Sequence, residues 1–366
     1  MRKIMTVRGA IDAHELGFTS MHEHTLTDVT AVIPNARKAI KVPQNRFPPE
    51  VGAKIKIEDL SYYRCGYFAI SEECRNTNDE DLMTAEVQDF KTMGGGAILD
   101  CSAPGIRPNI EGVRRISEKS DVHIIACTGL YAEEYWPEKY KNMSTGQYLD
   151  YMMKEMAVGI EDTDIRAGHI KAAVNQVTDQ QNIFLDAALM AAQQSGASIT
   201  THMGFKTGLQ DGRTILARML SNGLNPERLL LCHFQQYIQN YDLKTLVNDP
   251  NAWKPKMEYA LEVVDQGVNV CFDTFGLVWA LEHAGLVPQS DAYHFAAIVE
   301  LINKGYEDQI VIGTDIYLKI MTRRNGGHGY IRLLNYVVPT LQSLGVSDTV
   351  IKKITIDNPA RILSIK

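Results

Sequence analysis

Eight short apolar runs, each followed by a polar turn and a helical pattern, constrain the fold of this chain most strongly. Apolar runs of this kind between helices are typical of buried parallel strands. Eight such units favour a closed (β/α)8 TIM barrel over an open doubly wound sheet. The clearest helical patterns cover 84–93, 182–196 and 291–305. The predicted strands are 17–24, 96–103, 122–129, 169–174, 197–203, 228–234, 268–273 and 310–315.

Residues 25–83 interrupt this alternation, because they separate the first predicted strand from its helix. In a barrel, an insertion at this place lies above the face formed by the carboxyl ends of the strands. A loop of this length is usually functional or disordered. The aromatic residues Tyr62, Tyr63, Tyr67 and Phe68 favour an ordered lid, and an oligomer contact or a decorative excursion is the alternative. We predict that residues 1–366 form one domain.

Composition and charge exclude several classes of protein. The 366 residues are 45% apolar and carry a net charge of −7, which argues against a nucleic-acid partner because phosphate binding needs a basic surface. We expect no signal peptide and no transmembrane helix, because the chain lacks a long uninterrupted apolar stretch. The six cysteines are scattered without CxxC spacing, and four of them lie in strand-like runs, where a free thiol packs as a small hydrophobe. A cytoplasmic protein is expected.

Polar residues that end several predicted strands are the main functional signal. In the segment 22–24, two histidines are two residues apart, so their side chains point the same way and converge as metal ligands do. A lone histidine in an apolar run is more often a core residue. Burying a whole set without partners would be costly, which favours a shared metal centre. The set is His22, His24, His202, His233 and Asp315.

Lys171 lies within the predicted strand 169–174. A protonated amine there would be disfavoured both by burial and by repulsion from nearby cations. Reaction with CO₂ would convert it to a carbamate, whose two oxygens can bridge two metal ions. Two alternatives stay open on these residues alone. Lys171 can reach solvent, as most strand lysines do, or His169 on the same face of the strand can be the ligand.

Several segments in order resemble the phosphotriesterase-related branch of the amidohydrolase superfamily. The resemblance covers nearly the whole chain except 25–83, and it implies a binuclear metal centre. His22, His24 and Asp315 would hold one ion, and His202 and His233 the other. Carboxylated Lys171 and a hydroxide would bridge the two ions, with zinc expected first and manganese or cobalt as alternatives. The segments are MHEH (21–24), ACTGLYAEEYWPE (126–138), AGHIKAAVNQ (167–176), ITTHMG (199–204), LLCHF (230–234), GTD (313–315), GGHGY (326–330) and TIDNPARILSI (355–365).

The resemblance implies a hydrolase in which metal-bound hydroxide attacks a polarised carbonyl or phosphoryl group, with Asp315 accepting the proton. Some phosphotriester-cleaving members relay this proton through a histidine and an acid, which 271–276 and 233–237 do not supply. We therefore expect cleavage of a carboxylic ester or lactone, a sugar-lactone phosphate included, with promiscuous cleavage of phosphate and phosphonate esters. The alternatives are an amidohydrolase acting on an amide or other C–N bond and a non-catalytic metal- or ligand-binding barrel.

Substrate contacts are predicted around this centre. Tyr131 either donates a hydrogen bond to the substrate oxygen or packs under the lid, and Asp273 either binds substrate hydroxyls or orients a loop. In the loop 316–330, three cations could clamp a phosphate or carboxylate, or form a solvated or dimer-bridging loop. The partner is a small-molecule substrate, and a homodimer is expected because symmetric pairs are the commonest assembly. The three cations are Lys319, Arg323 and Arg324.

Overall fold

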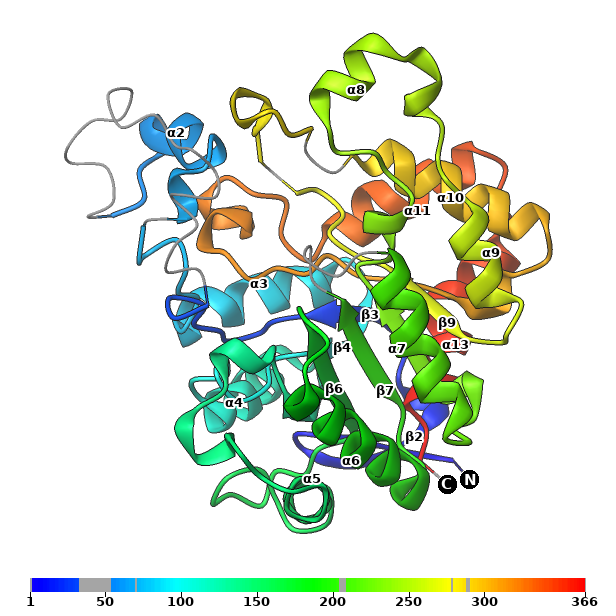
Figure 1. The fold of residues 1–366 in the computed structure, drawn as a ribbon. Helices are drawn as coiled ribbons and strands as arrows, with labels where there is room; N and C mark the ends of the chain where they lie inside the picture. The colour runs from blue at the N-terminus through cyan, green and yellow to red at the C-terminus, as the bar shows by residue number, and fades with distance from the viewer. Residues whose placement is uncertain are drawn as a thin grey trace.

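Eight parallel strands form a nearly closed barrel with helices around it, which confirms the predicted TIM barrel (Figure 1). The computed structural model describes residues 2–32, 54–69, 71–203, 209–277, 279–287 and 290–365. Each predicted strand is present, and neighbours in the chain are neighbours in the sheet, from β3 to β10. The strands are β3 (Phe18–Glu23), β4 (Gly95–Asp100), β5 (His123–Leu130), β6 (His169–Val174), β7 (Ile199–Met203), β8 (Leu229–Cys232), β9 (Asn269–Phe272) and β10 (Ile310–Ile312).

The first and last barrel strands meet where two predicted ligands lie. The backbone N–H of Asp315 donates to the carbonyl of His22 at 3.0 Å. A Cβ atom on Gly313 would lie 2.9 Å from both the backbone nitrogen and the backbone oxygen of His22, so this close approach needs glycine. The contact between β3 and β10 therefore fixes these segments against each other.

The helices bury their apolar faces against the barrel, and the three predicted helical patterns are confirmed by α3, α6 and α10. Caps define their ends. Thr178 accepts a hydrogen bond from the backbone of Gln181 at the start of α6, and Gly196 ends that helix with a φ of 73°. The helices around the barrel are α3 (Glu80–Thr92), α4 (Ile110–Ser120), α5 (Thr145–Ala157), α6 (Asp179–Ser195), α7 (Leu209–Ser221), α9 (Glu258–Val264), α10 (Asp291–Asn303), α11 (Val338–Ser343), α12 (Asp348–Lys352) and α13 (Asn358–Leu363).

An antiparallel hairpin, β1 (Lys3–Thr6) and β2 (Gly9–Asp12), precedes the barrel and was not predicted. Its turn donates a backbone hydrogen bond from Val7 to the carbonyl of Ile124, near the start of β5. The backbone of Ile365 donates to the carbonyl of Lys3, so the two ends of the chain meet here. Ile4 is fully buried among side chains of the barrel interior. The hairpin thus covers the amino-terminal end of the barrel.

At the opposite end, residues 54–69 pack on the loops that follow β9 and β10. The carbonyl of Arg64, in α2 (Leu60–Arg64), accepts from the backbone of Ala280 at 2.7 Å, and its guanidinium donates to the carbonyl of Gly326 at 2.7 Å. Phe68 is 2% exposed and stacks on Trp279 at 5.0 Å. Residues 33–53 and 70 lie outside the described residues, so the lid stays a prediction.

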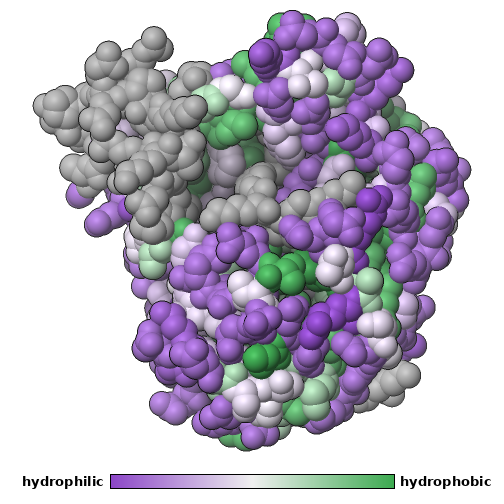
Figure 2. Space-filling model, in the orientation of Figure 1, coloured by the Kyte–Doolittle hydropathy of each residue, from purple (hydrophilic) through white to green (hydrophobic). Residues whose placement is uncertain are grey.

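A second excursion follows β8 and contains the short helix α8 (Leu243–Asn248), which projects from the top of the molecule in Figure 1. The sequence did not predict it. On the side shown in Figure 2, the surface is mostly hydrophilic, with hydrophobic residues in small separate groups. None of the described helices has the length and apolar content needed to cross a membrane. All six cysteines are free thiols.

Candidate metal centre

Unusual backbone conformations gather at the carboxyl ends of three neighbouring strands. His233, Thr274 and Asp315 have φ angles of 56°, 63° and 51°, and these residues lie just beyond β8, β9 and β10. The left-handed region is costly for residues other than glycine, and such strain is found mainly at functional sites. Two of these three residues are predicted metal ligands. The strain therefore coincides with the site that the sequence predicted.

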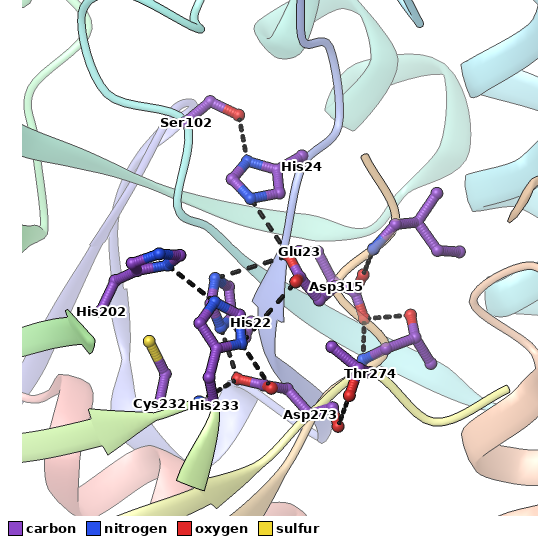
Figure 3. Close-up of polar contacts among 12 residues, drawn as sticks. His22, Glu23, His24, Ser102, His202, Cys232, His233, Asp273, Thr274 and Asp315 are labelled. Atoms are coloured by element: carbon purple, nitrogen blue, oxygen red, sulfur yellow. Dashed lines mark hydrogen bonds and ion pairs between the residues drawn. The ribbon is translucent and has the colours of Figure 1, made fainter. Parts of the chain in front are cut away.

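The β3–β10 side of the centre brings together His22, His24 and Asp315 (Figure 3). Oδ1 of Asp315 lies 3.2 Å from Nε2 of His24 and 3.7 Å from Nε2 of His22. One candidate ligand atom from each of the three residues lies within 4.8 Å of the other two, and all three side chains are buried. This group could hold a metal ion.

The other side is formed by β6, β7 and β8. Nδ1 of His202 lies 2.7 Å from Nε2 of His233, so two ring nitrogens converge. Lys171 joins the two sides, because its Nζ lies 3.1 Å from Nε2 of His22. The lysine is fully buried, and among the described residues the other hydrogen-bond partner of its Nζ is Sγ of Cys232, at 3.8 Å. A buried ammonium without a carboxylate partner is costly, and a modification that removes the positive charge of Lys171, such as carbamate formation, would remove that cost.

Asp273, which follows β9, holds two of the histidines. Its Oδ2 lies 2.6 Å from Nδ1 of His22, and its Oδ1 lies 2.8 Å from Nδ1 of His233. Both carboxylate oxygens are therefore engaged. Asp273 also accepts from the backbone of His233 at 3.0 Å and from the side chain of Gln235 at 3.1 Å, in agreement with the predicted alternative that it orients a loop, and a contact with substrate hydroxyls stays a prediction. Asp273 positions imidazoles and leaves their Nε2 atoms free to face the centre, as carboxylates behind metal-bound histidines do.

Two further positioning residues were missed in the sequence. Ser102, two residues beyond β4, lies with its Oγ 2.9 Å from Nδ1 of His24. Glu23 is buried and accepts hydrogen bonds from the backbone of Thr314 at 2.8 Å and of Ile316 at 3.1 Å. These bonds tie the loop that carries Asp315 to β3. Both residues gave a usable signal in the sequence, since Ser102 lies near the end of the predicted strand 96–103 and Glu23 lies between two histidines, on the opposite face of its strand.

The charge states of His22, His202 and Asp315 suit metal ligation. At His233, by contrast, the effect of burial is outweighed by the carboxylates of Asp273 and Asp315, which raise its pKa. Burial lowers the pKa of His22 to about 4 and that of His202 well below its usual range, so both rings are neutral at pH 7 and keep a lone pair. Burial alone would raise the pKa of Asp315, but the imidazoles of His22 and His233 outweigh it and lower that pKa. Asp315 is therefore ionised.

Tyr131 lies at the edge of the centre. Its ring centroid is 5.3 Å from that of His202. Burial raises the pKa of its phenol, so the hydroxyl keeps its proton and is a donor at neutral pH. A hydrogen bond from this hydroxyl to a substrate oxygen stays a prediction.

His169, the alternative to Lys171, does not face the centre. Its Nδ1 lies 2.8 Å from Oγ of Ser198, and its Nε2 lies 2.6 Å from Oγ1 of Thr200. Both ring nitrogens are engaged with hydroxyls at and before β7. The structure therefore places Lys171, and not His169, against the other predicted ligands.

The predicted anion clamp in the loop 316–330 is not formed. Nε of Arg323 lies 2.9 Å from Asp89, and Nη1 of Arg324 lies 3.0 Å from Glu86, both on α3. Nζ of Lys319 lies 3.4 Å from Glu73, beside a cavity of about 750 Å³. This cavity is unsuited to an anion, because acidic and amide side chains dominate its lining. The three cations neutralise carboxylates of the protein, which corrects the prediction. The lining residues are Asp28, Thr30, Glu72, Glu73, Asn76, Asn78, Asp79 and Lys319.

Comparison with known proteins identifies the family to which this chain belongs. An N-acetyltaurine hydrolase of Salmo salar is 27% identical, over 100% of this chain and 98% of that protein. The solved structure of a resiniferatoxin-binding protein from Rhodobacter sphaeroides is 27% identical, with a TM-score of 0.83 over 99% of this chain and 94% of that one. A lactonase from Listeria monocytogenes is 21% identical with a TM-score of 0.74, over 100% and 99% of the two chains, and shares the fold. The model of the phosphotriesterase family matches residues 2–363, and the chain belongs to that family.

Proposed function

We propose that this hydrolase of the phosphotriesterase family cleaves carboxylic acyl bonds at a centre of two divalent metal ions. The observation that carries the proposal is the convergence of two sets of ligand atoms on either side of the buried Lys171. Four imidazoles and one ionised carboxylate suit zinc first, and manganese or cobalt as alternatives.

The side chains divide between two ions by their contacts. His22, His24 and Asp315 would hold one ion, and His202 and His233 the other. Lys171 as a carbamate would lie between them. When bound, two divalent ions supply hydroxide at neutral pH and polarise the carbonyl oxygen of the substrate.

The protein's own residues have distinct tasks in this scheme. Asp315 is ionised and lies at the point where His22 and His24 converge, so it accepts the proton of the attacking hydroxide. Asp273 and Ser102 hold the imidazoles in orientation. The protonated phenol of Tyr131 donates a hydrogen bond to the developing oxyanion, as donors in oxyanion sites do.

Two kinds of acyl bond are candidates. A carboxylic ester or lactone is the substrate class expected from the sequence. The similarity to an N-acetyltaurine hydrolase over the full length of both proteins favours a second candidate, the amide of a small N-acyl amine. The same hydroxide and the same polarised carbonyl serve both bonds, and the two differ in the leaving group that must be protonated.

The described part of the 25–83 region supports a lid with an aromatic inner wall. Phe68 stacks on Trp279 at 5.0 Å, and Trp279 meets Tyr317 edge-on at 6.4 Å. Tyr317 is two residues beyond Asp315. This continuous row of rings would contact an apolar part of the substrate.

A hydrolysis screen of zinc- or manganese-loaded protein tests the function. The panel contains N-acetyltaurine, other N-acyl amines, sugar lactones and their phosphates, simple carboxylic esters, and phosphate and phosphonate esters. Acid release with a pH indicator reports any hydrolysis, and amine release identifies amide cleavage. We expect turnover of a carboxylic substrate that the Asp315→Asn variant lacks. Silence across the panel, with two metal ions bound per chain, would contradict the proposal and favour a non-catalytic barrel.

A further inference from the structure

Cys232 and His233 are consecutive, yet both approach the centre. In a regular strand their side chains would point to opposite faces. His233 has a φ of 56° and a ψ of 35°, which breaks this alternation at the end of β8. Candidate ligand atoms of His22, Cys232, His233 and Asp273 consequently lie within 4.8 Å of one another. In Figure 3 the Cys232 side chain points from its strand toward the histidines.

The contacts of the Cys232 thiol leave it directed at this group. The side chain is fully buried, and its S–H donates to the carbonyl of Thr201 at 3.4 Å. On the other side, Sγ lies 3.8 Å from Nζ of Lys171, the residue that joins the two halves of the centre. Of the cysteines, which all lie in the described part of the chain, Cys232 alone belongs to a group of side chains able to hold a metal ion.

We propose that Cys232 is a metal ligand of this centre, bound to the same ion as His233. The inference rests on the proposed function only in requiring that the centre binds metal. On binding, the thiol releases its proton to solvent and its sulfur forms a bond to the ion. A thiolate is a softer ligand than imidazole or carboxylate, so it favours zinc, cobalt or cadmium over manganese or magnesium. Cys232 therefore makes the centre selective for the softer ions.

Cobalt reports the bond directly, because a thiolate bound to Co²⁺ gives a charge-transfer absorption in the near ultraviolet. Metal-free protein is reloaded with Co²⁺, and the bound cobalt is counted by metal analysis. We expect this band in the wild-type protein and in Cys271→Ser, a matched variant of a buried cysteine on the neighbouring strand β9. We expect its loss in Cys232→Ser, with circular dichroism showing that the variant is folded. Bound cobalt without the band in the wild type, or the band persisting in Cys232→Ser, overturns the proposal.

Competition between metals gives a second test that does not depend on colour. Chelator titrations should show that Cys232→Ser weakens Zn²⁺ binding by on the order of 10-fold or more, while Mn²⁺ binding changes little. An equal loss for both ions would indicate a structural disturbance and would overturn the proposal. Neither test uses a substrate, so the two proposals can fail separately. A cobalt–thiolate band in a protein that hydrolyses no compound of the panel would contradict only the proposed function. Hydrolysis by a protein without the cobalt–thiolate band would contradict only the role of Cys232.

Discussion

Five histidines of this barrel differ in what their ring nitrogens face. His22, His24 and His233 each have Nδ1 held by a side-chain oxygen and Nε2 turned toward the centre. His169 has both nitrogens engaged by hydroxyls, and His294 has no hydrogen-bond partner for either among the described residues. Burial alone therefore does not make a ligand. A fixed ring with one nitrogen directed at shared space marks a candidate ligand.

The largest effect is expected where the free nitrogens converge. Asp315→Asn removes both a proposed ligand and the proposed proton acceptor, so kcat should fall by on the order of 10²- to 10⁴-fold. Steady-state kinetics on whichever substrate the screen identifies measures this, with circular dichroism as a check of folding. Activity within a few-fold of wild type would mean that the convergence of His22 and His24 on Asp315 has no catalytic role.

His294 should show the opposite behaviour, an effect on stability and not on metal binding. Its ring packs 4.6 Å from that of Phe275, and burial lowers its pKa to about 4. An unfolded chain takes up the proton near pH 6.5, so the contribution of the neutral ring is present above that pH and is lost as pH falls toward 4. The free energy of unfolding of the wild type should drop by about 3 kcal/mol more than that of His294→Leu over this range.

Urea unfolding of both proteins at pH 7 and pH 4 measures the difference. Acid release of metal affects both proteins alike and cancels in the comparison. Parallel loss of stability in the two proteins would show that His294 is solvated or partnered in solution.

A substitution of Asp273 tests whether the orientation of an imidazole ring affects metal binding. Asp273→Asn should weaken metal binding by about 10- to 100-fold, because His22 and His233 lose the carboxylate that fixes their orientation. Asp291→Asn is the matched control, since its carboxylate pairs with Arg332 at 2.7 Å and belongs to neither candidate metal group. Chelator competition gives both affinities. An unchanged metal affinity in Asp273→Asn, together with a raised KM, would indicate that Asp273 contacts the substrate.

The smallest effect is expected in the loop 316–330. Arg324→Ala should leave KM the same for phosphorylated and unphosphorylated substrates, because the guanidinium is already paired with Glu86 and Asp89. The loss should cost on the order of 1 kcal/mol of unfolding free energy, because Arg324 is partly exposed and the buried Glu86 carboxylate keeps two backbone hydrogen bonds. Matched kinetics on a lactone and its phosphate provide the test. A rise in KM for the lactone phosphate alone would show that the loop 316–330 contacts the phosphate group of the substrate.

The barrel could be predicted from the sequence because fully buried parallel strands appear there as continuous apolar runs, each bounded by a polar turn. All eight runs became β3 to β10. The hairpin of β1 and β2 could not be predicted, because strands of four residues are too short for a period of two to stand out in the sequence. The excursion with α8 escaped because a six-residue helix has too little periodicity to stand out.

Within the candidate site, strand alternation and the resemblance to a family named the residues to be brought together. Only the tertiary structure decided which partner each of them takes. His22 lies 251 residues from Asp273, and Arg324 lies 238 residues from Glu86. A local pattern fixes the face on which a side chain starts, but its partner depends on how strands, loops and flanking helices meet in space. For that reason the sequence could place Asp273 and Arg324 near the carboxyl ends of the strands, while only the fold turned one toward the histidines and the other toward α3.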